Sequence, residues 1–460
     1  MTLKQVEDRK SREWRLQRIN GGGMSKVAFY TLGCKVNQYE TEAMTEMFEN
    51  SGYETVDFNE KADVYVINTC TVTGLSARKS RQMIRRAKTL NREALVAVVG
   101  CYPQTSPEEV AGIPDVDIVI GTRERGRILE YVEKAQNRGE KVNAVSNIMK
   151  NSSFEELRIE RYKEKTRAFI KIQDGCSQFC SYCIIPYARG PVRSRPPGEV
   201  TAEVLKLRDN GFKEVVLTGI HIASYGRDLG NITLLELIKK IHEVEGIRRI
   251  RLGSIEPSTI TEEFAAAAGS LKKLCPHYHI SLQSGCNETL KRMNRKYTVE
   301  EYGRVVRLLR DNVKDVAFTT DVMVGFPGET GEEFEKTYRF LQEIFFTQMH
   351  VFKFSPRKGT PAASLTGQVD PRIKDERSDR VLRLSAGNTL KFNRMHIGRT
   401  MEVLFQQEVK NREGFYEGLT SNYIRVLCKG NDTIKGRIAQ TRLIGAEDDY
   451  MLGEISEGVF

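Results

Sequence analysis

The sequence predicts an α/β protein with three parts: an N-terminal open parallel sheet, a central partial (βα)6 TIM-type barrel, and a small C-terminal β-barrel. From Lys26 onwards, short apolar runs alternate with amphipathic segments, which is the pattern of parallel strands separated by helices. Six further apolar runs follow a polar linker, and each precedes a helical pattern. After about Met395 the chain changes to short alternating strands with glycine-rich turns.

We place domain boundaries at these changes of pattern. Residues 1–23 are basic and end in a glycine triplet, so they are either a genuine arm or sequence upstream of a physiological start at Met24. The polar linker lies around Asn151 to Lys165. The predicted domains are 24–148 for the open sheet, 162–392 for the barrel and 395–460 for the C-terminal β-barrel.

Three of the four apolar runs in the first domain are followed by a cysteine. The runs are Val27–Tyr30, Val64–Ile67, Leu95–Val99 and Val116–Ile120, and the cysteines are Cys34, Cys70 and Cys101. Because ligand sites gather beyond the carboxyl ends of parallel strands, the three thiols are expected to converge there. A single cysteine after a strand is usually an inert buried thiol, but three in equivalent places favour a three-ligand metal cluster.

Small residues precede each of these cysteines and would let the backbone approach a bulky cluster. They are Gly33, Thr69 and Gly100. Asn37 with Glu40 has the pattern of a helix cap just after Cys34, which predicts that this ligand loop is fixed to a helix.

The six runs of the second domain are expected to be the strands of the partial barrel. They are Ala168–Gln173, Glu214–Thr218, Ile250–Gly253, His277–Gln283, Val316–Val324 and Met349–Phe354. The active site of such a barrel lies at the carboxyl ends of its strands. The first of these ends carries the spacing Cys-x3-Cys-x2-Cys, formed by Cys176, Cys180 and Cys183.

Three soft thiolates at this spacing leave one corner of an iron-sulfur cluster open to another ligand. Four cysteines would instead close a structural zinc site or a fully ligated cluster. The alternative is a zinc loop that borrows a distant fourth ligand.

Histidines and the remaining cysteines give weaker signals. His221 has no visible partner in the sequence and is expected to be structural or exposed, whereas His277 and His279 share one face of a strand, which would allow metal binding. Cys275, Cys286 and Cys428 have no spacing partners, which predicts plain thiols.

Charge and cysteine usage indicate the compartment and the partner. The formal net charge is +10 with a pI near 9.0, which favours an anionic partner such as RNA. Nine cysteines and no apolar run near membrane-spanning length predict a cytoplasmic protein with reduced thiols and no membrane partner.

The C-terminal β-barrel would bind RNA or cap the larger barrel. Two basic faces are expected: Arg78, Arg81, Arg85 and Lys88, and Lys291, Arg292, Arg295 and Lys296.

Four strings of the sequence resemble the radical S-adenosylmethionine (SAM) methylthiotransferases. The resemblance extends from Met24 to the C-terminus, where the last segment resembles a TRAM domain. The strings are Thr31-Leu-Gly-Cys34-Lys-Val-Asn37-Gln-Tyr-Glu-Thr41, Asn68-Thr-Cys70-Thr-Val-Thr73, Gly100-Cys101-Tyr-Pro-Gln104, and Gly175-Cys176 through Cys183-Ile-Ile-Pro-Tyr-Ala-Arg-Gly190.

Two of these strings are similar to the MtaB-type branch of the family, which modifies threonylcarbamoyladenosine beside the tRNA anticodon. They are Lys35-Val-Asn-Gln-Tyr-Glu, and Thr-Val-Thr73 with Lys79-Ser-Arg81. The isopentenyladenosine branch more often has Gln-Met-Asn after its first cysteine, and the ribosomal-protein branch Pro-Lys-Asn. The resemblance therefore implies methylthiolation of carbon 2 of threonylcarbamoyladenosine, which gives ms2t6A.

The resemblance also implies the cofactors and partners. Two 4Fe-4S clusters are expected, one on Cys176, Cys180 and Cys183 that cleaves SAM reductively, and one on Cys34, Cys70 and Cys101 that supplies sulfur. SAM would be both radical source and methyl donor. The partners would be a tRNA anticodon stem-loop and a reductant such as flavodoxin or ferredoxin. Expected SAM contacts are Tyr182, Gly219, Ser254, Glu256 and Gln283.

Two other functions stay open. One is methylthiolation of another target, either isopentenyladenosine in tRNA or a ribosomal protein. The other is a noncatalytic iron-sulfur regulator that binds RNA, which would not cleave SAM. Beyond the cluster ligands, no side chain has a pattern that indicates a catalytic role.

Overall fold

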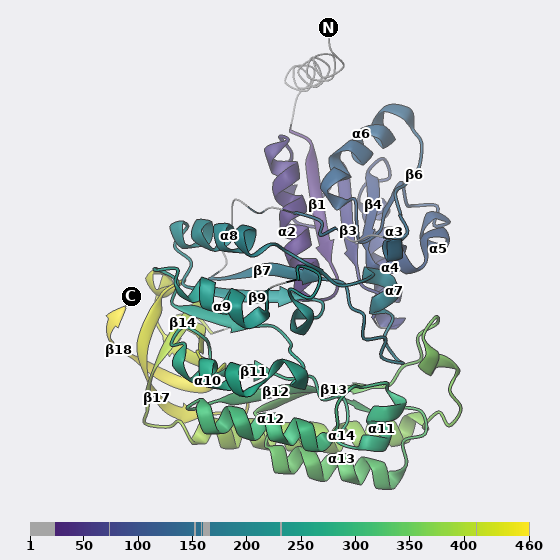
Figure 1. Cartoon of the computed structure of the whole chain (residues 1–460). Helices are drawn as coiled ribbons and strands as arrows, with labels where there is room; N and C mark the ends of the chain where they lie inside the picture. Colours follow the sequence, from purple (N-terminus) through teal and green to yellow (C-terminus); the bar gives the residue numbers. More distant parts are fainter. Residues whose placement is uncertain are drawn as a thin grey trace. The chain divides into compact units, whose positions relative to one another are not determined.

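The computed structural model describes residues 24–72, 74–150, 153–157, 159, 166–230, 232–410 and 412–459. Residues 1–23 and most of the predicted linker lie outside the described part of the chain. The chain divides into two compact units. The first contains the residues up to Ile148 together with 155–161, and the second contains 149–154 together with the residues from Tyr162 onwards. Each unit is described by itself (Figure 1). The finer domain boundaries stay predictions.

The first unit is built on the predicted parallel sheet. Its strand order is β2-β1-β3-β4-β5-β6, and every neighbouring pair is parallel. The predicted strands are present, and the short edge strands β2 and β6 are additional. The strands are β1 (Lys26–Thr31), β2 (Glu54–Val56), β3 (Val64–Thr69), β4 (Leu95–Gly100), β5 (Ile118–Ile120) and β6 (Val142–Asn143).

Helices cover both faces of this sheet, because successive strand residues point to opposite sides. On β3, Tyr65 and Ile67 pack in one apolar cluster, with α3 (Gly74–Leu90) and α5 (Pro107–Ala111). Val64 and Val66 pack in the other, with α2 (Lys35–Asn50) and α6 (Ile128–Arg138). The short helix α4 (Cys101–Thr105) follows β4 directly. Strands buried on both faces are typical of parallel sheets.

The second unit contains the predicted six-stranded partial barrel. Two sheets, β10-β9-β7-β8 and β11-β12-β13, are joined by isolated parallel bridges from Ile250 to Leu274 and from Ile255 to Ile280. Only β8 is antiparallel to its neighbour. The strands are β7 (Arg167–Asp174), β8 (Arg193–Ser194), β9 (Glu214–Gly219), β10 (Arg249–Leu252), β11 (His277–His279), β12 (Ala317–Val324) and β13 (Gln348–Lys353).

Helices follow the strands of the partial barrel and pack on its outer side (Figure 1). Thr233, Thr298 and Thr330 begin three of them with complete capping boxes, which satisfy free backbone N–H groups at the helix start. The helices are α7 (Ile185–Arg189), α8 (Pro197–Asp209), α9 (Leu234–His242), α10 (Glu262–Ser270), α11 (Asn287–Arg292), α12 (Val299–Asn312), α13 (Gly331–Ile344) and α14 (Pro371–Arg394).

The C-terminal segment forms a closed five-stranded barrel in the order β14-β15-β16-β18-β17. The short alternating strands predicted after about Met395 are thus present, and the last of them, β18, has weak apolar alternation because it contains two glycines and two glutamates. The strands are β14 (Thr400–Glu408), β15 (Phe415–Thr420), β16 (Arg425–Lys429), β17 (Ile438–Ala446) and β18 (Met451–Val459).

Buried arginines join this C-terminal barrel to the partial barrel. Arg249 donates to the carbonyl oxygens of Glu402 (2.7 Å) and Leu419 (2.9 Å). Arg251 donates to the carbonyl oxygens of Thr420 (3.2 Å) and Ser421 (3.0 Å). Residues of β14, the end of β15 and the loop after it therefore cover the amino end of β10, which fits the alternative that this segment caps the partial barrel, while RNA binding by it stays a prediction.

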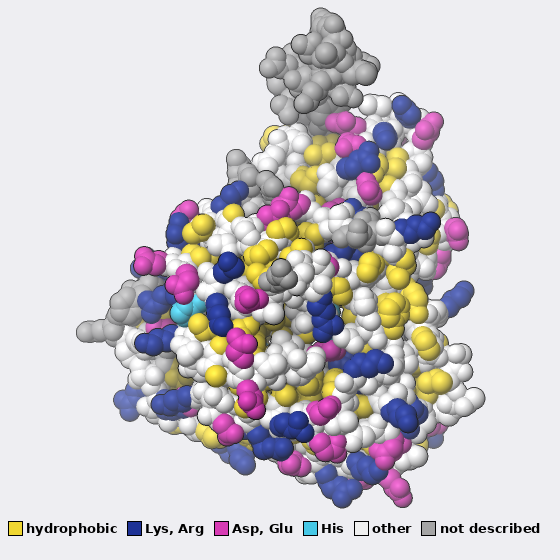
Figure 2. Space-filling view, in the orientation of Figure 1, with side chains coloured by type: hydrophobic (Ala, Val, Ile, Leu, Met, Phe, Trp, Pro, Cys, Tyr) yellow, Lys and Arg dark blue, Asp and Glu magenta, His cyan; other side chains and the backbone are white. Residues whose placement is uncertain are grey.

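Within the described residues, no helix is both long enough and apolar enough to cross a membrane. On the face shown in Figure 2, Lys and Arg side chains are interspersed with Asp and Glu.

Candidate active site

The three N-terminal cysteines lie beyond three neighbouring strands, as the sequence predicts. Cys34 precedes the first residue of α2, Cys70 follows β3, and Cys101 is the first residue of α4. Gly33 has a φ of +111°, and a Cβ added there would lie 3.0 Å from Cys70 Cβ and 3.3 Å from its Sγ. Glycine is therefore required where the β1 loop passes Cys70. The role of these cysteines as ligands stays a prediction.

Asn37 fixes this cluster loop, but by a different contact from the one predicted. Its Nδ2 donates to the carbonyl oxygens of Leu32 (2.7 Å) and Thr69 (3.0 Å), so it joins the loops after β1 and β3. The predicted Asn37–Glu40 cap is wrong, because Cys34 is the N-cap and makes no capping hydrogen bond. Glu40 is fully buried and forms an ion pair with Arg125.

The second cysteine set occupies the loop after β7. Gly175 begins this loop with a φ of +76°, and a Cβ there would come within 1.8 Å of the Pro191 carbonyl oxygen. The Cys176 N–H donates to Gly190 O (2.9 Å), and the Cys183 N–H donates to Cys180 O (2.9 Å). Cys180 is buried, while Cys176 and Cys183 are partly exposed.

Residues at the end of α11 and just after it hold the middle of the same loop. The Ser181 N–H donates to Met293 O (3.0 Å), and its hydroxyl donates to Arg292 O (2.8 Å). Asn294 Nδ2 donates to Phe179 O (2.8 Å). Ligands on such a well-anchored loop are held in place before a cofactor binds.

Arg295 contacts this cysteine loop directly, so its prediction as part of an exposed basic face is wrong. Its side chain is 6% exposed, and Nη1 lies 3.3 Å from Cys180 Sγ. Its Nη2 forms a 2.9 Å ion pair with Glu256. A cation donating to a ligand sulfur is the kind of contact that tunes an iron-sulfur cluster.

Glu256 connects Arg295 to His221. The Nε2 of His221 lies 2.9 Å from the second carboxylate oxygen of Glu256, and its backbone N–H donates to Gln173 Oε1 (2.7 Å). His221 is thus buried and paired, a partner that the sequence did not reveal. Burial alone would raise the pKa of Glu256, but His221 and Arg295 lower it below its ordinary value.

The thiols of this loop have perturbed acidities. Burial raises the pKa of Cys176 to about 11 and that of Cys183 to about 12, so both are protonated at neutral pH without a metal. A bound metal cluster would replace those protons. Three thiols on one anchored loop, with a cationic donor against one sulfur, fit a cluster that keeps one iron open.

The other predicted SAM contacts lie on the same strand ends. Tyr182 is partly buried with its ring 6.5 Å from that of Phe326, and Gly219 ends β9, where a Cβ would meet Gln173. Ser254 is exposed in the loop after β10. Gln283 has a φ of +70° and accepts from Met323 through its carbonyl oxygen. Their contacts to SAM stay predictions.

The remaining sequence signals resolve in different ways. Cys275, Cys286 and Cys428 are buried. Of the predicted basic stripe on α3, Arg81 pairs with Glu109 and Lys88 with Asp117, so these two charges are used within the protein. Arg292 likewise pairs with Glu333.

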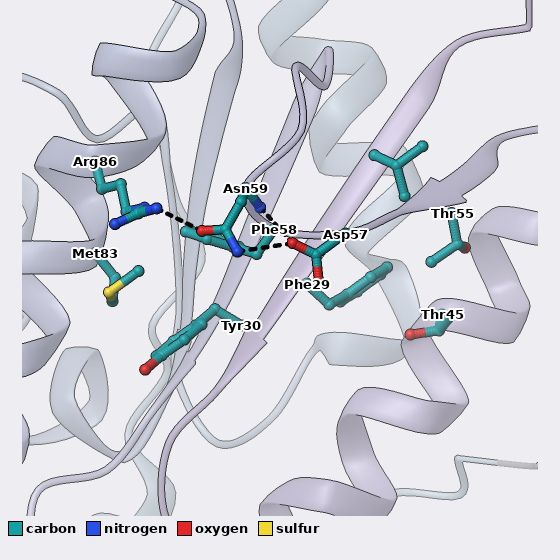
Figure 3. A pocket seen from close by; sticks show the side chains of 10 residues that line it. Phe29, Tyr30, Thr45, Thr55, Asp57, Phe58, Asn59, Met83 and Arg86 are labelled. Atoms are coloured by element: carbon teal, nitrogen blue, oxygen red, sulfur yellow. Dashed lines mark hydrogen bonds between the residues drawn. The ribbon is translucent and has the colours of Figure 1, made fainter. Parts of the chain in front are cut away.

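A pocket of about 510 Å3 lies in the first unit (Figure 3). Its walls come from β1, α2, the end of β2 with the residues after it, and α3, and two of the lining residues are joined by a hydrogen bond from Arg86 to Asn59 Oδ1 (2.6 Å). None of the six predicted cluster ligands lines it.

Comparisons with known proteins agree with this geometry. Residues 170–341 match the model of the radical SAM superfamily, and residues 26–121 match a family described as uncharacterized protein family UPF0004. Among solved structures, the radical SAM methyltransferase TsrM from Kitasatospora setae has a TM-score of 0.54 at 18% identity. The match covers 74% of this chain and 77% of TsrM, which shows a shared fold.

Curated relatives match nearly the whole chain. Threonylcarbamoyladenosine tRNA methylthiotransferase MtaB of Bacillus subtilis is 45% identical over 94% of this chain and 96% of its own length. The Aquifex aeolicus protein of the same name is 41% identical over 88% and 97%. A tRNA-2-methylthio-N(6)-dimethylallyladenosine synthase of Pelotomaculum thermopropionicum is 34% identical over 94% and 98%.

The fold and the cysteine loop after β7 define a radical SAM enzyme, a class that uses SAM with a 4Fe-4S cluster. Within that class, the chain belongs to the radical SAM methylthiotransferase family, in its MtaB-type branch.

Proposed function

We propose that this enzyme transfers a methylthio group to carbon 2 of threonylcarbamoyladenosine next to the tRNA anticodon, giving ms2t6A. The identity of 45% over 94% of the chain to the B. subtilis MtaB enzyme carries this proposal. The dimethylallyladenosine relative has a lower identity, 34%, over the same share of the chain. Both cysteine sets that such an enzyme needs are present on anchored loops.

The cofactors supply the chemistry that side chains cannot. When bound, the two clusters and SAM would supply the radical chemistry needed at the unactivated C–H bond of the adenine ring and the sulfur that replaces its hydrogen. Cys176, Cys180 and Cys183 would hold the first. Cys34, Cys70 and Cys101 would hold the second, which is supported by their position after three neighbouring parallel strands.

The protein's own residues position these groups and the base. Arg295 donates to Cys180 Sγ and, with His221, lowers the pKa of Glu256, so that Glu256 is ionised beside this loop. The substrate adenosine would have to leave its stack in the anticodon stem-loop to reach the strand ends. A cytoplasmic reductant such as flavodoxin or ferredoxin would deliver the electron.

Nucleoside mass spectrometry tests this proposal. Anaerobically reconstituted protein with SAM and a reductant should convert threonylcarbamoyladenosine in tRNA to ms2t6A. Conversion of isopentenyladenosine instead, or of a ribosomal protein, would assign a different target. Binding of tRNA without any cleavage of SAM would identify the noncatalytic regulator.

A further inference from the structure

Three polar side chains from adjacent strands converge inside the partial barrel. His279 Nε2 on β11 lies 3.4 Å from one carboxylate oxygen of Asp321 on β12. His350 Nδ1 on β13 lies 3.3 Å from the other. The two imidazole rings are stacked with centroids 5.6 Å apart.

The strand alternation turns these side chains away from the helices. Tyr278, Val322 and Met349, which flank them in sequence, belong to the apolar core beneath the helices. Lys353, at the end of β13, instead pairs with Asp375 on α14 (2.7 Å). His279, Asp321 and His350 therefore line the inner face of the partial barrel.

A hydrogen bond outside the cluster fixes His279. His279 Nδ1 and His277 Nε2 each lie 3.0 Å from Thr319 Oγ1, which orients the His279 ring. Burial alone would raise the pKa of Asp321, but the two histidines lower it well below its usual range, so this group is a carboxylate.

His350 is the open member of the cluster. Its side chain is 53% exposed, and its Nδ1 is occupied by Asp321. Among the described residues, its Nε2 has no protein partner. Because Nδ1 bonds to Asp321, a ring that carries both protons directs its second N–H outward, where it can donate to an anion.

Phe352 lies two residues further along β13 and is 47% exposed, unusual for a large apolar side chain on an inner face. In the strand register, Phe352 is opposite Met323, just as His350 is opposite Asp321. Side chains two residues apart on a strand are separated by roughly 6.6 Å. An aromatic surface thus lies one step from the open ring nitrogen of His350.

We propose that Phe352 and His350 form the subsite for the modified base, in which Phe352 contacts the adenine and His350, supported by Asp321 and His279, binds the carboxylate of the threonylcarbamoyl group. The inference rests on the proposed function, because that nucleoside joins a flat ring to a carboxylate through a short urea linker. A base–aromatic contact and a charge-assisted hydrogen bond would then select this nucleoside over unmodified adenosine.

Binding to three anticodon stem-loop RNAs tests this subsite. They carry threonylcarbamoyladenosine, its methyl ester, or unmodified adenosine, and are titrated into reconstituted holoenzyme with SAM. The wild-type protein should bind the free carboxylate about tenfold to a hundredfold more tightly than the ester. His350→Ala and His350→Gln should lose this preference and keep the ester affinity, while Phe352→Ala should weaken binding of both modified RNAs.

Lys353→Ala is the matched control, because it changes the same strand on its outer side and should leave the preference unchanged. Retention of the carboxylate preference by both His350 variants, with normal iron content, would overturn the inference.

Two histidines and a carboxylate whose donor atoms all lie within 4.8 Å could alternatively hold a divalent metal ion. One equivalent of a metal other than cluster iron, lost in His350→Gln, would therefore also overturn the proposal. The binding preference is measured without turnover. A wild-type protein that prefers the carboxylate but forms no ms2t6A would contradict the proposed function and not the subsite.

Discussion

Arg295 is the residue whose role the sequence concealed most completely. It is 115 residues from Cys180 and sits among Lys291, Arg292 and Lys296, where a solvated basic face is the ordinary interpretation. Its burial depends on how α11 and the following loop pack against the cysteine loop. That packing is long-range, so neither spacing nor periodicity could indicate it. The cysteines themselves could be predicted because their spacing is local.

Gly175 provides a test of the cysteine loop at the scale of one residue. Gly175→Ala should prevent normal assembly of the cluster on Cys176, Cys180 and Cys183. The added Cβ would clash with the backbone of Pro191, and alanine is also unfavourable at the positive φ of this position. Iron analysis should show the loss of up to about four of eight irons, because the other cluster is unaffected, and 5′-deoxyadenosine formation should fall at least severalfold.

Gly211→Ala is its control, since Gly211 also has a positive φ, +86°, but no atom lies within 4 Å of the added Cβ. This variant should lose only about 1 kcal/mol of stability and keep its iron. Equal behaviour of the two variants would contradict a specific steric requirement at Gly175.

At the scale of elements, the strands of both units were predictable and the helix starts were less so. Hydrophobic runs such as Val64–Ile67 indicate a buried strand by themselves, and the order of runs indicates a parallel sheet. Asparagine is a frequent helix N-cap residue, which is why the sequence predicts a cap at Asn37. In the structure, the Asn37 side chain instead bonds to the backbone of Leu32 and Thr69. The nine-residue strand β18 pairs with both β16 and β17, contacts that its weak apolar alternation does not indicate.

The two cysteine loops belong to different elements, which predicts separable losses. Replacing Cys34, Cys70 and Cys101 by alanine should remove about four irons. The variant should still form 5′-deoxyadenosine from SAM, but no methylthio product on tRNA. Replacing Cys176, Cys180 and Cys183 should also leave one cluster and abolish 5′-deoxyadenosine formation.

Each triple variant is the control for the other, and iron content with product analysis distinguishes them. Two intact clusters in either variant would refute the ligand assignment. Methylthiolated tRNA from the first variant would refute the sulfur-donating role of its cluster.

At the scale of the whole molecule, a buried charge cluster at the base of the partial barrel links stability to pH. Glu214 is fully buried and accepts from Arg251 Nε (2.8 Å), with Arg249 at 3.7 Å. Burial alone would raise the pKa of Glu214, but these arginines lower it below its ordinary value. The ionised Glu214 carboxylate therefore contributes its full stabilisation above about pH 4.5, the pKa of a glutamate in the unfolded chain. This stabilisation is lost as the pH falls through the lower pKa that Glu214 has in the folded protein.

Glu214→Gln should lower the free energy of unfolding by about 3–5 kcal/mol at neutral pH, because it leaves the arginines buried without their counter-charge. The difference from wild type should shrink as the pH falls below about 4. Denaturant titrations at several pH values measure this. Glu262→Gln, on the exposed start of α10, is the control and should change little.

The loop that covers the base of the partial barrel is translated well after the arginines that it contacts. Arg251 bonds to Ser421, 170 residues later in the chain. At synthesis rates of about 5–20 residues per second, roughly ten to thirty seconds separate the emergence of these two residues from the ribosome. During synthesis, the arginines at the base of the partial barrel therefore lack their C-terminal partners for this time. The C-terminal strands are translated last, long after the cysteine loop that follows β7.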